Sequence, residues 1–404
     1  MSTVKIGVIR EGKNPPDKRV PLSPQQCLDA MNAYPNLEIV VQPSPIRKFR
    51  DKEYSALGIR LEEDLSGCDI LIGVKEVPMD MLIPNKTYLF FSHTFKLQPY
   101  NAKLLKTVLD KKIRLIDYEV LKAKGKRLIG FGRYAGIVGC YNGFRTFGIK
   151  HGLYQLKPAN QCEDRKEMEA ELDKVQLPGN AKIVLTGFGR VGHGAREIIS
   201  LLPIEEVSKE AFAEHEFEHP VFTHLNTEDY NERVADQGFD KKEFYAGEGE
   251  YRSSFDRYSS QADMYIACHY WSEGSPFIFT REDMKKDDWR ISTVADISCD
   301  IDGPVACTIR PSTIADPIYG YDPTSETETV FTSPTAIAVM AVDNLPCELP
   351  KDASEDFGNE LTTHILPLLV NGDQDDILEK ASETTLEGEL GQHFKYLEDY
   401  VANA

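Results

Sequence analysis

Three polar groups that can transfer protons follow strand-like apolar runs in the first third of the chain. Lys75 comes after DILIGV, His93 after TYLFFS, and Asp117 with Glu119 after IRLI. The carboxyl ends of parallel strands meet at one edge of an open α/β sheet, which is where such sheets bind ligands. Lysine and histidine both serve as general acids or bases. This arrangement predicts an acid/base site at that edge.

Two arginines near these groups suit an acidic substrate. Arg19 lies in the loop after the first predicted strand, and Arg127 lies in the segment KGKRLIGFGRYAG. A guanidinium group offers a planar fork of donors that matches a carboxylate. Together with a lysine and a histidine, the two arginines favour a pocket for an amino acid or an oxo acid.

A glycine motif further along the chain predicts a dinucleotide site. Gly187, Gly189 and Gly192 form GxGxxG between the apolar run AKIVLT and an amphipathic stretch. Glycines at a strand-to-helix turn let backbone N–H groups and a helix N-terminus approach a pyrophosphate. The strand-turn-helix context therefore favours NAD or NADP as the cofactor.

The choice between NAD and NADP depends on which segment forms the second strand after this motif. If that strand ends near 206–207, Ser208 and Lys209 would permit a 2′-phosphate. If it is 221–226, Glu228 or Asp229 would bind ribose hydroxyls and favour NAD. NAD is the preferred prediction, and NADP is not excluded.

An α/β scaffold is needed to bring these residues together, and the chain has the pattern of one. Helices are predicted at 137–156, 332–346 and 353–372, and at 23–34, where Ser23 can cap and Pro24 can occupy the first turn. Short apolar runs predict buried strands at 4–9, 37–42, 69–74, 87–93, 113–119, 263–271 and 290–300.

The predicted fold is α/β, with two Rossmann-like domains of parallel sheets and the active site in the cleft between them. A length of 404 residues suits two domains. Residues 1–145 with 325–404 would form a discontinuous substrate domain. Residues 146–324 would form the dinucleotide-binding domain, with an insertion around 205–260 where the sequence is polar and irregular.

An excess of acidic side chains limits the expected partners. The 65 Asp and Glu residues against 46 Lys and Arg give a net charge of -19, which repels nucleic-acid phosphates and anionic lipids. No apolar run reaches about 18 residues, and the start lacks a signal-peptide profile, so a cytoplasmic protein is expected. The eight cysteines are scattered, and neither a disulfide framework nor a metal site is expected.

At these residues the sequence resembles the lysine-forming saccharopine dehydrogenases, and more closely the lysine-ketoglutarate reductase half of the bifunctional animal and plant enzyme. Alanine dehydrogenase and the transhydrogenase alpha subunit are distant relatives of this family. The matching stretches keep one order along nearly the whole chain: KRVPLSP (18–24), ILIGVKEVP (70–78), KTYLFFSHTFKLQ (86–98), IRLIDYE (113–119), IGFGRYAGIVG (129–139), VLTGFGRVGHGA (184–195), HYWSEGSPFIFTREDM (269–284), VADISCDIDGP (294–304) and AVDNLP (341–346).

The resemblance implies an oxidoreductase of lysine metabolism that interconverts saccharopine, NAD(P)+ and water with L-lysine, 2-oxoglutarate and NAD(P)H. It implies that Lys75 is the proton acceptor and His93 the proton donor. The implied substrate contacts are Arg19, Gln98, Arg127, Phe131, Ser298, Cys299 and Asp300. The implied dinucleotide contacts, beside the glycines of the motif, are Lys126, Arg190, Tyr270, Ile297, Val342, Asp343, Asn344 and Leu345.

The chain departs from the family pattern at two places. Fungal single-domain members have a much shorter loop where this chain carries 205–260, so the reductase half of the bifunctional enzyme is the better template. A position that is cysteine in some fungal relatives is Val191 here, so a disulfide with Cys268 cannot form.

Two other functions stay open. An alanine dehydrogenase-like enzyme would also use a lysine and a histidine after first-domain strands, although FSHTFKLQ and HYWSEGSP argue against it. A non-enzymatic dinucleotide sensor would need the glycine loop but no acid/base pair. Small molecules are the expected partners in each case, and the sequence does not define the oligomeric state.

Overall fold

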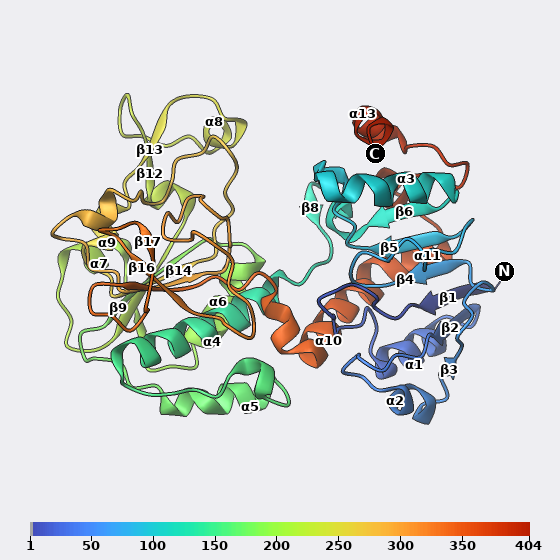
Figure 1. Ribbon diagram of the computed structural model, residues 1–404, viewed down its shortest axis with the longest axis horizontal. Coiled ribbons are helices and arrows are strands. Elements are labelled where there is room, and N and C mark those ends of the chain that lie inside the picture. The colour runs from blue at the N-terminus through green and yellow to red at the C-terminus, as the bar shows by residue number, and fades with distance from the viewer. Residues whose placement is uncertain (1–2) are drawn as a thin grey trace. The chain divides into compact units, whose positions relative to one another are not determined.

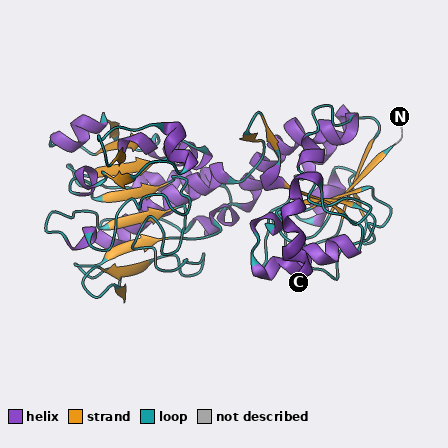
Figure 2. Cartoon of the chain, turned by 90° about the horizontal axis from the view of Figure 1, so that it is seen from above, coloured by secondary structure: helices purple, strands orange, loops and turns teal. Residues whose placement is uncertain are grey.

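The computed structural model describes residues 3–404, which divide into two compact units (Figure 1). The first unit holds residues 3–131 and 350–404, and the second holds 132–349. In each unit, helices flank the strands (Figure 2). The unit boundaries therefore differ from those that the sequence pattern places after 145 and before 325.

Both shifts of the boundaries have a packing reason. Helix α4 (Gly132–His151) belongs to the second unit because it packs closely on α6 (Arg190–Ile199). A Cβ added to Gly136 would lie 1.9 Å from the carbonyl oxygen of Val191, so only glycine permits this approach. Residues 332–346 are wrongly predicted as a helix: they contain β18 (Ile337–Met340), a strand of the second unit's sheet.

The first unit is built on a six-stranded sheet in the order β3-β2-β1-β4-β5-β6, with every pair parallel. The strand order reverses at β1, so a ligand crevice is expected at the carboxyl ends of β1 and β4. The strands are β1 (Val4–Val8), β2 (Leu37–Val41), β3 (Arg60–Leu61), β4 (Ile70–Ile72), β5 (Thr87–Phe90) and β6 (Arg114–Asp117). The five strands predicted here are present, although each is shorter than its apolar run.

Helices from both ends of the chain cover this sheet. The predicted cap of α1 is confirmed, because the Ser23 side chain accepts from the N–H of Gln26 and Pro24 begins the helix. The helices of this unit are α1 (Pro24–Ala33), α2 (Asp51–Ala56), α3 (Ala102–Asp110), α10 (Pro350–Glu360), α11 (Leu366–Asn371), α12 (Ile377–Lys380) and α13 (Glu398–Ala402).

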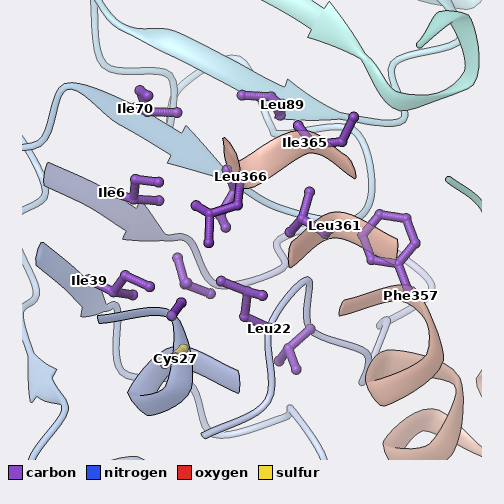
Figure 3. Close-up of a cluster of buried hydrophobic side chains, with 14 of the residues drawn as sticks. Ile6, Leu22, Cys27, Ile39, Ile70, Leu89, Phe357, Leu361, Ile365 and Leu366 are labelled. Atoms are coloured by element: carbon purple, nitrogen blue, oxygen red, sulfur yellow. The ribbon is translucent and has the colours of Figure 1, made fainter. Parts of the chain in front are cut away.

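The C-terminal helical segment shares a core with the first unit's sheet, as predicted for 353–372. Figure 3 shows Leu361, Ile365 and Leu366 directed toward the side chains of the strands, among them Ile6 and Leu89. All five side chains are at most 3% exposed. Burial of aliphatic side chains of this size stabilises the fold by roughly 1.5–3 kcal/mol each, so the C-terminal segment is integral to this unit.

The second unit contains an eight-stranded sheet in the order β10-β11-β9-β14-β15-β18-β16-β17. The pairs from β10 to β18 are parallel, whereas β16 and β17 form an antiparallel edge that the prediction of parallel sheets did not include. The strands are β9 (Lys182–Thr186), β10 (Glu205–Glu206), β11 (Val221–Leu225), β14 (Met264–Ala267), β15 (Thr293–Asp296), β16 (Tyr319–Asp322), β17 (Thr327–Thr329) and β18. The α/β class with two Rossmann-like sheets is confirmed.

The segment 205–260 is only partly an insertion. It supplies β10 and β11 to the sheet, so the prediction of an excursion over its whole length is wrong. The hairpin of β12 (Asn231–Arg233) and β13 (Tyr251–Ser253) carries α8 (Lys241–Ala246) between its strands. The remaining helices of the unit are α5 (Arg165–Ala170), α7 (Lys209–Glu214) and α9 (Asp256–Ser259).

No helix within residues 3–404 combines the length and the apolar character that crossing a membrane requires. The same residues contain no group of three or more His, Cys, Asp and Glu side chains arranged to hold a metal ion. All eight cysteines are free, and Cys299 and Cys347 are the two that are not fully buried.

Candidate active site

Lys75 lies in the loop after β4, beside a buried carboxyl group. The backbone N–H groups of Val74 and Lys75 donate to the Glu11 carboxylate at 2.7 and 2.9 Å. Burial lowers the pKa of Lys75, and the nearby charge of Arg19 lowers it further. Burial and the charge of Asp17 raise the pKa of Glu11 to about 7. The loops after β1 and β4 therefore bring together an amine of lowered pKa and a carboxyl group whose pKa is raised to about 7.

Arg19 forms a buried ion pair with Asp17. Its Nε and Nη2 atoms donate to the two carboxylate oxygens at 3.0 and 2.6 Å, and both residues are at most 3% exposed. Burial alone would raise the pKa of Asp17, but Arg19 holds it well below its usual range. The guanidinium carbon also lies 4.1 Å from the ring centroid of Phe131. A substrate carboxylate that binds Arg19 would therefore bind an arginine that is already ion-paired with Asp17.

His93 lies between two carboxylates. Its Nδ1 is 3.2 Å from Glu76 Oε1, and its Nε2 is 3.6 Å from Glu119 Oε2. Burial would raise the pKa of Glu76, but hydrogen bonds from His93 and Lys13 lower it to about 2. His93 adopts the left-handed conformation with φ of 56°, which is uncommon for residues other than glycine. Glu76 follows Lys75 directly, so the two predicted proton-transfer residues lie in one network.

Glu119 connects two cations, Lys96 and Arg127, to the network around His93. Lys96 Nζ is 2.9 Å from its carboxylate, and Arg127 Nη1 is 3.5 Å away. Burial opposes ionisation of Glu119, but Lys96 and Arg127 bring its net pKa below the usual value. Arg127 therefore lies with the acid/base residues, as the sequence predicts.

Two predicted residues of this unit lie outside these contacts. The Gln98 side-chain oxygen accepts from the Tyr100 hydroxyl at 2.5 Å. Lys126 is exposed in the hairpin of β7 (Lys122–Ala123) and β8 (Lys126–Arg127).

Sequence reasoning missed five charged members of this network. All five lie in the loops after β1, β4 and β5, and a search of those loops for charged residues would have found them. These residues are Glu11, Lys13, Asp17, Glu76 and Lys96.

The glycine loop of the second unit has the steric properties of a pyrophosphate site. Gly187 has φ of 95°, and a Cβ there would lie 2.4 Å from the carbonyl oxygen of Cys268. A Cβ on Gly192 would lie 1.8 Å from the Gly187 oxygen. In contrast, a Cβ on Gly189 would meet no atom within 4 Å, so nothing in the protein requires glycine there. That open space at the start of α6 fits the close approach of a phosphate group.

The loops after β14, β15 and β18 carry the other predicted dinucleotide contacts of this unit. These strands follow β9 in the sheet order, so their carboxyl ends lie at the same edge as the glycine loop. Tyr270 is 80% exposed after β14. Arg190 is the first residue of α6. The remaining residues of the group are Ile297 after β15 and Val342, Asp343, Asn344 and Leu345 after β18.

The loop after β15 is shaped by Asp296. The buried Asp296 carboxylate accepts from the N–H and the hydroxyl of Ser298 at 3.1 and 2.6 Å, and from the N–H of Cys299 at 3.1 Å. Burial and the charge of Asp296 raise the pKa of Asp300 to about 6. The predicted substrate residues thus fall into two groups: this loop in the second unit, and Arg19, Gln98, Arg127 and Phe131 in the first.

The second strand of the dinucleotide fold is β11, because it pairs with β9 in parallel from Val221 to Leu225. The alternative in which that strand ends near 206–207 is wrong, since β10 is the sheet edge beyond β11. Asp229 follows β11 and accepts from the N–H of Asn226 at 2.7 Å, and it forms an ion pair with Lys209.

Comparison with known proteins gives consistent relatives. Residues 7–138 match the family model of the alanine dehydrogenase/PNT N-terminal domain. Alpha-aminoadipic semialdehyde synthase of Arabidopsis thaliana is 29% identical over 88% of this chain and 38% of its own length. The mitochondrial protein of the same name from Bos taurus is 29% identical over 90% and 43%. This chain therefore spans about two fifths of the length of these relatives.

A saccharopine dehydrogenase [NAD(+), L-lysine-forming] of Yarrowia lipolytica is 25% identical and matches along almost its full length, with 90% of this chain and 92% of that protein covered. Among solved structures, an L-alanine dehydrogenase has a TM-score of 0.66 at 17% identity and covers 99% of both chains. The transhydrogenase from Sinorhizobium meliloti has a TM-score of 0.58 at 12% identity and covers 96% of this chain and 98% of that one. These two structures share the fold.

Proposed function

We propose that this chain, which belongs to the superfamily of alanine dehydrogenase, the transhydrogenase alpha subunit and the saccharopine dehydrogenases, interconverts saccharopine with L-lysine and 2-oxoglutarate. Its likeness to this superfamily supports the coarser part of the proposal, an oxidoreductase that uses a nicotinamide dinucleotide and a small-molecule substrate. The observation that carries the more specific proposal is the contact of His93 Nδ1 with Glu76, the residue next to Lys75. Two groups able to move protons thereby lie at the ends of the paired strands β4 and β5.

The two groups have complementary roles in forming the carbon-nitrogen bond. The amine of lysine adds to the keto carbon of 2-oxoglutarate, and the resulting carbinolamine loses water to give an imine. We assign His93 to protonate the departing hydroxyl group and Lys75 to accept the proton from the substrate nitrogen. Lys75 must be neutral to do so, and its burial beside Arg19 favours the neutral form.

The second unit supplies the proposed dinucleotide site. The open space at Gly189, set between two glycines that the backbone requires, supports this assignment. When bound, the dinucleotide exchanges a hydride with the substrate carbon. The residues proposed to hold it are Gly187, Gly189, Arg190, Gly192, Tyr270, Ile297, Val342, Asp343, Asn344 and Leu345, with Lys126 from the first unit.

The substrate carboxylates are proposed to bind the cations of the first unit. Arg127 and Arg19 carry the planar donors that suit a dicarboxylate such as 2-oxoglutarate. Further substrate contacts are proposed for Gln98, Phe131, Ser298, Cys299 and Asp300. NAD is the proposed cofactor, because the strand register puts Glu228 and Asp229 just after the second strand.

The test is the oxidation of NADH and of NADPH in the presence of lysine and 2-oxoglutarate together, followed by omission of each in turn. The proposal expects turnover only when both are present, with NADH preferred. Turnover with pyruvate and ammonia would support an alanine dehydrogenase-like enzyme instead. Binding of NADH without turnover on any of these substrates would support a dinucleotide sensor.

A further inference from the structure

The carboxyl group of Glu383, from the C-terminal part of the chain, lies close to the loop that holds His93. Glu383 follows α12, and its N–H donates to the carbonyl oxygen of Leu115 at 2.8 Å. The next residue, Thr384, accepts from the N–H of Leu115 at 2.9 Å through its hydroxyl group. The C-terminal segment, red in Figure 1, thereby lies along the edge strand β6 of the first unit. This pairing places the Glu383 side chain in contact with Ser92 and Thr94, the two neighbours of His93 in the chain.

Four side chains form a closed polar cluster at this place. Glu383, Asp117, Ser92 and Thr94 are each 0% exposed. Thr94 Oγ1 is 2.5 Å from Glu383 Oε2 and 2.7 Å from Ser92 Oγ, and Ser92 Oγ is 2.8 Å from Asp117 Oδ2. A longer contact of 3.1 Å joins Ser92 Oγ to Glu383 Oε1. The three short contacts form one line from Glu383 through Thr94 and Ser92 to Asp117.

Counting hydrogens along this line locates a proton. Each short oxygen-oxygen contact needs one hydrogen, and a hydroxyl group supplies only one. Ser92 and Thr94 together supply two hydrogens for the three contacts in the line. The third hydrogen must therefore come from one of the two carboxyl groups.

Asp117 is the ionised member of the pair. Its Oδ2 accepts from the N–H groups of Ser92 and His93 at 2.7 and 2.9 Å, and its Oδ1 accepts from the N–H of Glu119 at 2.7 Å. Three backbone donors stabilise a charged carboxylate. The remaining carboxyl group, on Glu383, carries the proton and donates it to Thr94.

We propose that neutral Glu383 is a positioning residue for His93, acting through the line Glu383–Thr94–Ser92–Asp117 that ends at the His93 backbone N–H. The inference rests on the proposed role of His93 in proton transfer. The N–H bond to Asp117 helps to hold His93 in its left-handed conformation, which residues other than glycine adopt at a cost in backbone energy. Ionising Glu383 removes the hydrogen that orients Thr94 and Ser92, and it places a second negative charge beside Asp117.

The surroundings of Glu383 agree with this assignment. Burial and the charge of Asp117 raise the pKa of Glu383 to about 8, and burial also raises the pKa of Asp117. Tyr396 and Tyr400, from the C-terminal helical turns, also sense the charge of Glu383, and His93 senses the charge of Asp117. The pKa values of the two tyrosines are raised too, so neither tyrosine supplies a charge at neutral pH. The cluster thus changes charge when Glu383 loses its proton.

The experiment follows the imidazole resonances of His93 by NMR as the pH is raised, in the full-length protein without substrate. The His93 signal is identified by its loss in His93→Gln. The wild-type signal should show an inflection near pH 8, and Glu383→Gln, which is permanently neutral, should abolish that inflection. The matched control is Glu348→Gln, which replaces another buried carboxyl group, in the second unit, and should keep the inflection. An inflection that persists in Glu383→Gln, or a wild-type protein without one, overturns the proposal.

Turnover gives a second readout. Glu383→Gln can still donate to Thr94 and should keep kcat within about twofold, whereas Thr94→Val breaks the line and should lower kcat by roughly tenfold with NADH affinity unchanged. Equal kcat values for Thr94→Val and wild type would contradict the positioning role. Absence of turnover with lysine and 2-oxoglutarate would refute the proposed reaction. It would not decide the role of Glu383, because the NMR titration of His93 needs no substrate.

Discussion

The Nδ1 atom of His93 lies 3.2 Å from the Oε1 atom of Glu76, and Glu76 is the chain neighbour of Lys75. The contact ties the loop after β5 to the loop after β4, which are adjacent parallel strands. A displacement of either loop therefore changes the environment of both proposed proton-transfer groups. This coupling gives the catalytic proposal its most direct test.

Removing either proton-transfer group should lower kcat strongly. Lys75→Met and His93→Gln should each reduce kcat by about 100- to 10,000-fold, because general acid/base groups typically contribute that much. The dissociation constant for NADH, measured by fluorescence, should hardly change, since the glycine loop belongs to the other unit. The double variant should lose much less than the product of the single losses, because both groups serve one intermediate. Fully multiplicative losses, or a single variant with normal kcat, would count against a shared site.

Two valine substitutions in the glycine loop should have different effects: one should weaken NADH binding in a folded protein, and the other should disturb folding. Gly189→Val should fold normally, because an added Cβ meets no protein atom within 4 Å. Its NADH affinity should nevertheless fall at least tenfold, or about 1.4 kcal/mol, because the new side chain occupies the space of the pyrophosphate. Gly192→Val is the comparison and should fail to fold correctly, since its Cβ would lie 1.8 Å from the Gly187 oxygen. Unchanged NADH affinity in folded Gly189→Val would remove this loop from the cofactor site.

The sequence predicts those parts of the site whose positions depend on local patterns. Lys75 and His93 follow short apolar runs, and the glycine motif lies between a strand and a helix that its neighbours define. These patterns persist in the structure because the strands are buried on both faces and most of their residues are therefore apolar. The order of strands around β1 then brings the loops to one edge of the sheet.

Other features depend on contacts that no local pattern reveals. Glu383 reaches the site only because the C-terminal segment pairs with β6. The run around Ile337–Met340 is apolar on every side, so its period does not distinguish a buried strand from a helix, and pairing with β15 decides the outcome. Asp17 lies two residues before Arg19 in a loop, and only the fold shows that the two side chains are buried together.

Breaking the buried Asp17–Arg19 pair should cost stability. Asp17→Asn removes the carboxylate that pairs with the buried Arg19 guanidinium, and removal of one partner of such a pair typically costs about 3 kcal/mol or more. Urea denaturation would measure the free energy of unfolding. The control is Glu63→Gln, which breaks the exposed pair with Arg10 and should cost less than about 1 kcal/mol. Similar losses in the two variants would contradict the importance of burial at Asp17.

Glu11 should make the stability of the protein depend on pH in a defined direction. Its pKa is raised from 4.5 to about 7, so between these values the unfolded chain has released a proton that the folded protein still holds. The contribution of Glu11 is fully present below pH 4.5 and is lost as the pH rises through 7. Glu11→Gln cannot titrate, so its free energy of unfolding should fall less steeply over this interval than that of the wild type. Denaturation curves collected across the interval measure both slopes, and equal slopes would mean that Glu11 is already ionised in the folded protein.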